Sequence, residues 1–134
     1  MLDALRTETQ TENEAIRQAA LDYIEGWYTA NAERMERALH PHLAKRIVFP
    51  ATAVGGKDQL DQMTAMELIQ RTKSGIGLTP EDKQQKEVTI LDRYENAASV
   101  KIVAKSWIDY LHMAKFEGKW VIINVLWELK PRRG

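Results

Sequence analysis

The chain contains no cysteine, and this absence excludes several classes of protein at once. Without thiols there can be no disulfides, thiolate nucleophiles, iron–sulfur clusters or cysteine-ligated zinc sites. Long apolar segments are also absent. Residues 1–8 form no signal-like stretch, and no run approaches the roughly 18 apolar residues that a bilayer requires. We therefore expect a soluble, cytoplasmic protein.

An excess of charge of either sign is missing as well. Nineteen basic and nineteen acidic residues cancel to a net charge of zero, so no overall field draws the chain to nucleic acid or to an anionic membrane. With 134 residues, of which 44% are hydrophobic and 28% charged, the composition is typical of one globular domain spanning residues 1–134. We expect neither a nucleic-acid partner nor a membrane partner.

Motifs for several common chemistries are absent too. No serine lies in a nucleophile-elbow pattern. The Gly75-Ile76-Gly77 stretch lacks the preceding strand and following helix that a dinucleotide-binding loop needs. The histidines His40, His42 and His112 show no His-Glu-x-x-His spacing. We therefore predict no metal site and no cofactor.

The first part of the chain has helical periodicity. Apolar residues recur at intervals of three and four over residues 11–30, and Thr11 and Glu14 have capping-box spacing. These signals predict a helix over residues 11–30. Asn31 is placed to cap a short second helix, Ala32 to Leu39.

The middle of the chain combines a short apolar run with a strong helix-start signal. The run Ile47-Val48-Phe49 ends at Pro50, which indicates a short edge strand or a ragged hairpin. Thr64 and Glu67 form a second capping box. We expect a helix from there to about residue 73, ending at Gly75.

From residue 87 onward the pattern changes to that of β-structure. The predicted strands are Val88–Tyr94, Ala98–Ala104, Trp107–Phe116 and Trp120–Leu129. Hairpin turns are expected at Glu95-Asn96 and Glu117-Gly118, with a bend near Lys105-Ser106. Helices followed by strands predict an α+β architecture, in which the helices pack on one face of a curved antiparallel sheet.

Four segments carry a family resemblance: Ala19–Tyr28, Ala38–Arg46, Asp109–Met113 and Gly118–Asn124. In this order they resemble the putative lumazine-binding branch of the nuclear transport factor 2-like (NTF2-like) superfamily. The resemblance implies a cystatin-like cone, in which a strongly bent sheet wraps around N-terminal helices and leaves a pocket open at one end, commonly as a homodimer. Relatives include isomerases, dehydratases, SnoaL-like polyketide cyclases and plain binding modules, so the fold leaves the function open.

Four residues are candidates for a ligand site. Tyr23 and Trp27 lie one turn apart on the inward face of the first helix, and Trp107 and Asp109 share one face of a strand. We predict that they border one cavity, where the rings stack on a ligand and Asp109 or the Tyr23 hydroxyl fixes a polar group. The alternative is that the aromatic residues belong to the core and that Asp109 forms a structural ion pair.

The candidate catalytic residues are Asp109, Tyr23, His40 and His112. Tyr23 resembles the tyrosine with which ketosteroid isomerases bind a developing oxyanion. The position of their general-base aspartate is Phe49 here, so that mechanism lacks its proton acceptor. Convergence of Asp109 with either histidine in one buried cavity would favour an enzyme.

Two functions therefore stay open, and with them the question of whether the chain is an enzyme. The first is a small-molecule-binding protein with an apolar, aromatic pocket, whose ligand is a lumazine-type heteroaromatic only by family name. The alternative is a cofactor-independent isomerase, dehydratase or cyclase acting on a small cyclic or polyketide-like substrate.

The strands over residues 87–129 carry apolar residues on both faces, whereas helices can cover only one. On the last strand, strict alternation sets Val121, Ile123, Val125 and Trp127 against Trp120, Ile122 and Leu126. An uncovered face of this size exceeds the patch that monomers usually expose, so we predict a homodimer formed through it. Tyr110 and His112 lie opposite Asp109 on their strand and would suit such an interface, although alternation alone leaves open which side lines the cavity.

Overall fold

Helices and strands alternate in the first half of the chain, and a strand meander follows. The computed structural model describes residues 2–131, without the side chains of residues 2–6, 53 and 54. The elements are α1 (Leu2–Tyr28), α2 (Ala32–Ala38), β1 (Leu39–Phe49), α3 (Ala51–Val54), β2 (Gln59–Thr64), α4 (Ala65–Lys73), a 3-10 turn (Glu81–Lys83), β3 (Lys86–Tyr94), β4 (Ala97–Ala104), β5 (Trp107–Phe116) and β6 (Lys119–Leu129).

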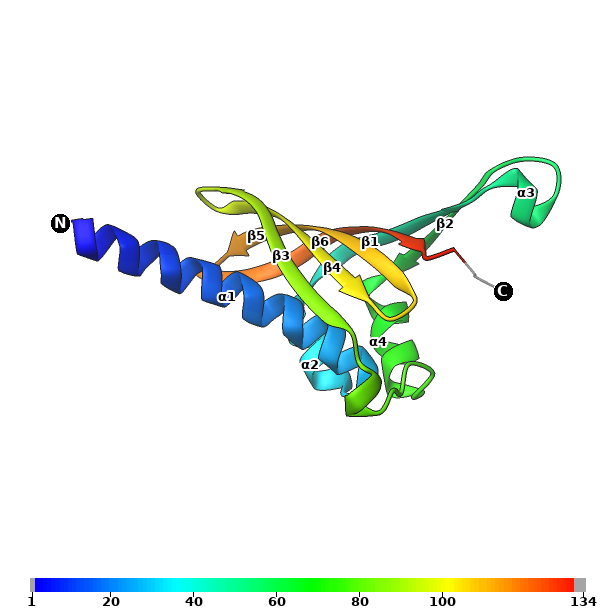
Figure 1. Ribbon diagram of the computed structural model, residues 1–134, viewed down its shortest axis with the longest axis horizontal. Coiled ribbons are helices and arrows are strands. Elements are labelled where there is room, and N and C mark those ends of the chain that lie inside the picture. The colour runs from blue at the N-terminus through cyan, green and yellow to red at the C-terminus, as the bar shows by residue number, and fades with distance from the viewer. Residues whose placement is uncertain (1, 132–134) are drawn as a thin grey trace.

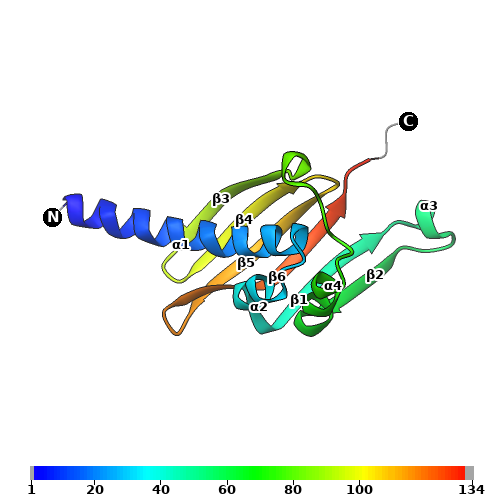
Figure 2. The same ribbon diagram turned by 90° about the horizontal axis from the view of Figure 1, so that it is seen from below.

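The six strands form one curled sheet in the order β2-β1-β6-β5-β4-β3. The pairs β1–β2, β3–β4, β4–β5 and β5–β6 are antiparallel, as expected, but β1 and β6 run parallel. The expectation of a wholly antiparallel sheet is therefore wrong at this pair. After β2 and α4 the chain crosses to the far edge and returns strand by strand until β6 reaches β1 (Figure 2).

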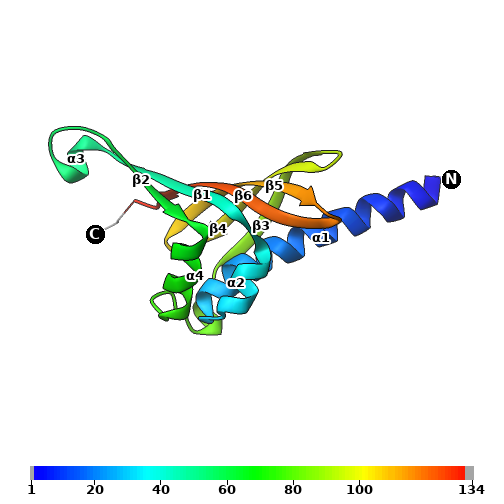
Figure 3. The ribbon, with the colours of Figure 1, turned by 180° about the vertical axis from the view of Figure 1, so that it is seen from behind.

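The helices lie on one side of the sheet. α1 runs across the concave face, with α2 and α4 beside its C-terminal half (Figures 1 and 2). The N-terminal part of α1 extends past one end of the sheet, and the β1–β2 hairpin with α3 extends past the other (Figure 3). The opposite face carries no helix within the described residues. The α+β cone expected from the sequence is confirmed.

The first helix is longer than the sequence analysis predicted. It begins at Leu2, so the Thr11–Glu14 pair is not its cap. Residues 2–10 contain no proline or glycine and are rich in Leu, Ala, Glu, Arg and Gln, which have high helix propensity and extend the helix upstream.

The transition from α2 to β1 differs from the expectation in a second way. The Asn31 side chain accepts a hydrogen bond from the Arg34 backbone N–H, which confirms the cap. The helix nevertheless ends at Ala38, and a strand of 11 residues begins at Leu39. Pro41 favours an extended residue before it, so the chain enters the strand at once. This strand lies inside the sheet between β2 and β6, not at its edge.

The later elements follow the predictions closely. The capping box of Thr64 and Glu67 opens α4, which ends just before Gly75 with its φ of +81°. Both predicted hairpin turns are present, with positive φ angles at Glu95 and Glu117. The chain also reverses at Lys105-Ser106, between β4 and β5.

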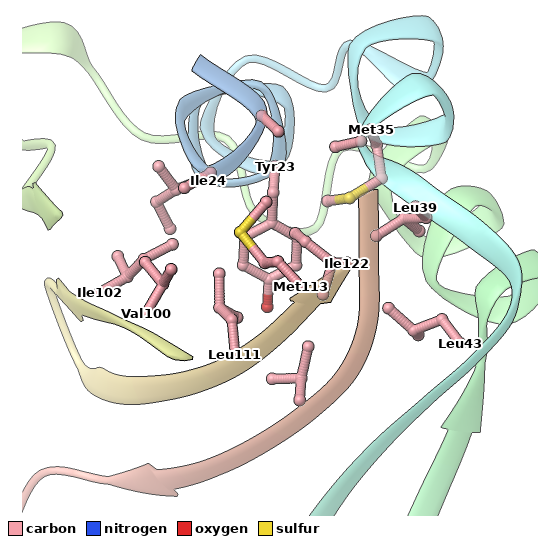
Figure 4. Close-up of a cluster of buried hydrophobic side chains, with 14 of the residues drawn as sticks. Tyr23, Ile24, Met35, Leu39, Leu43, Val100, Ile102, Leu111, Met113 and Ile122 are labelled. Atoms are coloured by element: carbon pink, nitrogen blue, oxygen red, sulfur yellow. The ribbon is translucent and has the colours of Figure 1, made fainter. Parts of the chain in front are cut away.

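The core lies between α1 and the concave face of the sheet. Tyr23 and Ile24 of α1 meet Leu111, Met113 and other side chains of β4, β5 and β6 there (Figure 4). A bulge in β6 shifts its register between the partners of His112 and Met113.

Because of this bulge, the strict alternation of faces expected along β6 is wrong. An extra residue reverses the faces of everything beyond it, so that Trp120, Ile122 and Val125 are all buried while Ile123 and Leu126 are exposed.

Candidate functional site

A cavity of about 230 Å³ lies where the C-terminal end of α1 meets α4, β1 and the adjoining ends of β5 and β6. Its wall is largely aromatic and aliphatic, with two basic residues. The lining residues are Trp27, Lys45, Met63, Leu68, Arg71, Ile76, Trp107 and Trp127. A larger hollow of about 710 Å³ lies between α1 and the β3–β4 turn, but mostly exposed polar side chains line it. The apolar cavity is therefore the better candidate for a small-molecule site.

The three tryptophans reach the cavity from three different elements. Trp27 lies on α1 one turn from Tyr23, and Trp107 and Trp127 lie near the paired ends of β5 and β6. The Trp107 Nε1–H donates a 2.8 Å hydrogen bond to Asp109 Oδ2. Tyr28 packs against the same indole, with ring centroids 6.1 Å apart. These contacts fix the Trp107 ring in the wall.

Lys45 is the residue that the sequence analysis missed. It is buried on β1, where Leu43, Lys45 and Ile47 alternate onto the inner face. Its Nζ donates a 2.6 Å hydrogen bond to the Tyr23 hydroxyl and lies 5.3 Å from the centroid of the Trp127 ring. A lysine at an apolar position of an alternating strand was the available signal.

Asp109 is fully buried beside this lysine and tyrosine. Its Oδ2 accepts the bond from Trp107, whereas Oδ1 has no hydrogen-bond partner among the described residues. Burial raises the pKa of Asp109, although the charge of Lys45 and hydrogen bonding from Trp107 and Tyr23 oppose the rise. The carboxyl therefore holds its proton to a higher pH than an exposed aspartate does.

The two neighbours of Asp109 are shifted by the same burial. Burial lowers the pKa of Lys45, with the Asp109 charge opposing. Burial, followed by the Asp109 charge, raises the pKa of Tyr23 well above its ordinary value. Each group thus favours its neutral form more than it would in water. Chemically, the cluster can donate protons or hydrogen bonds to an oxygen, and its lysine can bind an anion.

The four predicted ligand-site residues lie close to one another. Trp27 and Trp107 line the cavity, whereas Tyr23 and Asp109 adjoin it through their hydrogen bonds to Lys45 and Trp107. The inner face of β5 is the one that carries Asp109.

The histidines do not join this cluster. His112 is exposed on the opposite face of β5, next to Asn124. His40 packs against Phe116, at the far end of β5 from Trp107. The convergence of Asp109 with His40 or His112 that would have favoured an enzyme is not present. Alternation separates His112, and the length of the strand separates His40.

The described part of the chain lacks two further kinds of feature. Among those residues, no group of three or more His, Asp or Glu side chains could hold a metal ion. Within the same residues, no helix is both long enough and apolar enough to cross a bilayer.

A curled sheet that holds a helix in its concave face, with a pocket between the helices and one end of the strands, defines a cone-shaped α+β protein of the NTF2-like class. Residues 11–128 match the family described as "Putative lumazine-binding". The chain belongs to this family.

Solved structures share the fold at low sequence identity. An NTF2-like protein of unknown function from Shewanella baltica is 21% identical, with a TM-score of 0.73 over 91% of this chain and 96% of that one. Another from Silicibacter pomeroyi is 12% identical, with a TM-score of 0.75 over 91% and 98%. A ketosteroid isomerase-like protein from Erwinia carotovora atroseptica is 12% identical, with a TM-score of 0.60 over 89% and 96%. A comparison with curated proteins gives no match.

Proposed function

We propose that this protein binds a flat aromatic or heteroaromatic small molecule of about two fused rings. The observation that carries the proposal is the set of three tryptophans around one cavity of about 230 Å³. A cavity of roughly 150 Å³ accepts benzene, so this one has room for a second ring. A lumazine-type ring system, which the family description names, fits that size.

Binding is favoured over catalysis because the acid–base groups are poorly placed for turnover. Of the buried titratable residues, only Lys45 lines the cavity. The resemblance to ketosteroid isomerases sets Phe49 at the position of their general base, and both candidate histidines lie outside the cavity lining. The Asp109–Tyr23 pair supports an isomerase or dehydratase as the second candidate, since both groups favour their protonated forms and could stabilise an enolate oxygen.

Calorimetric titration with lumazine, a pterin and a flavin tests the binding proposal. We expect the bicyclic compounds to bind more tightly than the larger flavin. Trp27→Ala is expected to weaken binding by at least about tenfold, or ~1.4 kcal/mol, because it removes one stacking surface. Since Trp27 is only half-buried, its loss should cost less stability than the about 3–5 kcal/mol of a fully packed ring.

Tyr94→Ala is the control, because Tyr94 is 80% exposed and lies at the end of β3, outside the cavity lining. It should bind like the unmodified protein. If none of the compounds binds the unmodified protein, or if Trp27→Ala binds them equally well, the proposal is wrong.

We also propose that the chain forms a homodimer through the helix-free face of the sheet. Large apolar side chains between 42% and 61% exposed gather there: Val48, Leu60, Tyr110, Ile123 and Leu126. Val48 is paired with Leu60, and Tyr110 with Leu126, so their exposed side chains lie next to each other across strands. An apolar patch of this kind supports burial against a second copy.

Sedimentation at micromolar concentration tests the dimer. The unmodified protein should have twice the 15.4 kDa mass of one chain. Leu126→Asp should yield monomers, because it places a charge in the middle of the patch. Met66→Asp is the control, since Met66 is exposed on α4, away from that face. A mass near 15.4 kDa for the unmodified protein would refute the proposal.

A further inference from the structure

We propose that the ligand carries a negatively charged group and that Lys45 binds this group inside the cavity. The inference rests on the proposed function and narrows its ligand class to acidic bicyclic aromatic compounds, such as ring carboxylates or ionised ring imides. It is drawn from the hydrogen bonds and charges around the lysine.

The charged residues of the cavity wall are all basic. Two of the lining residues are basic, Lys45 and Arg71, and none of the others is acidic. Lys45 is buried, whereas Arg71 is exposed on α4. An anion would therefore meet a positive charge first at the rim and then at depth.

Lys45 has unused hydrogen-bonding capacity. An ammonium group has three N–H donors, and among the described residues only the Tyr23 hydroxyl accepts from it. No described carboxylate lies within 4.0 Å of Nζ in an ion pair. A buried ammonium that makes no ion pair is costly, and an anionic oxygen in the cavity would supply both a further acceptor and a contacting negative charge.

The groups that surround Lys45 leave a position beside its ammonium group for an anionic oxygen of a ligand. Tyr23 faces it from α1 and Trp127 from β6, with ring centroids 5.1 Å and 5.3 Å from Nζ. Asp109 lies on β5, and its charge and that of Lys45 act on each other's pKa, but the two side chains form no ion pair within 4.0 Å.

The aromatic walls select the rest of the ligand. Trp27, Trp107 and Trp127 offer ring faces and edges for a planar molecule. A small inorganic anion would leave these surfaces in contact with water. The combination of indoles with one buried cation therefore favours an aromatic acid over either a neutral arene or a free phosphate.

A matched pair of probes tests the inference: 2-naphthoic acid, which is ionised at pH 7, and 2-naphthamide, which has the same rings and no charge. Calorimetry on the full chain should show the acid binding at least about tenfold more tightly. Lys45→Met, of similar length but uncharged, should bind both equally. Lys45→Arg should keep a preference for the acid, and Lys57→Met, at an exposed lysine, should behave like the unmodified protein.

Each outcome has a separate meaning. Equal binding of acid and amide to the unmodified protein overturns this inference but leaves the aromatic pocket standing. Failure of both probes to bind overturns the proposed function itself. A preference for the acid that survives in Lys45→Met overturns the assignment to Lys45. If Lys45→Met does not fold by circular dichroism, the comparison of the two probes on the unmodified protein still decides the ligand class.

Discussion

Replacing Asp22 by alanine is expected to lower the free energy of unfolding by about 3 kcal/mol. Asp22 is buried on α1, and its carboxylate accepts hydrogen bonds from Arg34, Arg37 and Gln18. Both arginines belong to α2, so this carboxylate ties the two helices together, beside the ion pair that Glu25 of α1 makes with Arg34. Alanine would leave the partly buried Arg34 and its neighbours without this acceptor. Chemical denaturation of the two proteins measures the difference.

The stability lost in Asp22→Ala should depend on pH, because folding shifts the pKa of Asp22. Burial opposes ionisation, but the hydrogen bonds from Arg37, Arg34 and Gln18 outweigh it and hold the pKa of Asp22 below its ordinary value. The stabilisation is therefore complete above the ordinary carboxyl range near about 4 and is lost as the pH falls through the folded pKa. The difference in free energy of unfolding between Asp22→Ala and the unmodified protein should therefore shrink as the pH falls below about 4.

Glu36→Ala is the matched control for this experiment. It removes the same charge from the exposed side of α2, where no side-chain partner of Glu36 occurs among the described residues. Its stability should change by less than about 0.5 kcal/mol. A deficit in Asp22→Ala no larger than this control would contradict the role given to Asp22.

Replacing Gly77 by alanine is expected to cost about 1–3 kcal/mol of stability and to weaken ligand binding. A Cβ built on Gly77 would overlap the Trp27 indole ring. Since the loop after α4 lies directly against this ring, either the loop or the indole must move. The indole is a wall of the cavity, so its displacement should disturb binding of any planar ligand.

A double-variant cycle isolates this clash. If the indole is the cause, Gly77→Ala should cost almost nothing in a Trp27→Ala background, because the overlapping atoms are gone. An equal cost in both backgrounds would show that the loop backbone, and not Trp27, requires glycine. Denaturation midpoints for the four proteins provide the measurement.

Sequence reasoning predicted the elements whose signals are local. The capping box at Thr64 and Glu67, the turns after Tyr94 and Phe116, and the strands of the meander all depend on residues close together in the chain. β2 was missed because its residues, Gln59–Thr64, are mostly polar and exposed. The parallel pairing of β1 with β6 depends on contacts between distant segments, which no local pattern encodes.

The candidate site could be predicted only in part, because only some of its residues are linked by local sequence patterns. Alternation on β5 put Trp107 and Asp109 on one face, and helical spacing joined Tyr23 to Trp27. Lys45 escaped because it lies between the predicted helix, which ends at Leu39, and the predicted strand, which begins at Ile47. Only the full length of β1 places Lys45 between Leu43 and Ile47 on the inner face. Its hydrogen bond to Tyr23 joins residues 22 positions apart.

The parallel pairing of β6 with β1 also determines the order in which the molecule can be assembled during synthesis. β6 is made after the other five strands of the sheet, yet it lies between the β1–β2 hairpin and the β3–β5 meander. Until residues 119–129 leave the ribosome, these two halves share no strand pairing. Such distant contacts are slow to form, because the loop-closure entropy must be overcome first. The cavity is completed only when β6 joins the sheet, since β6 carries Trp127.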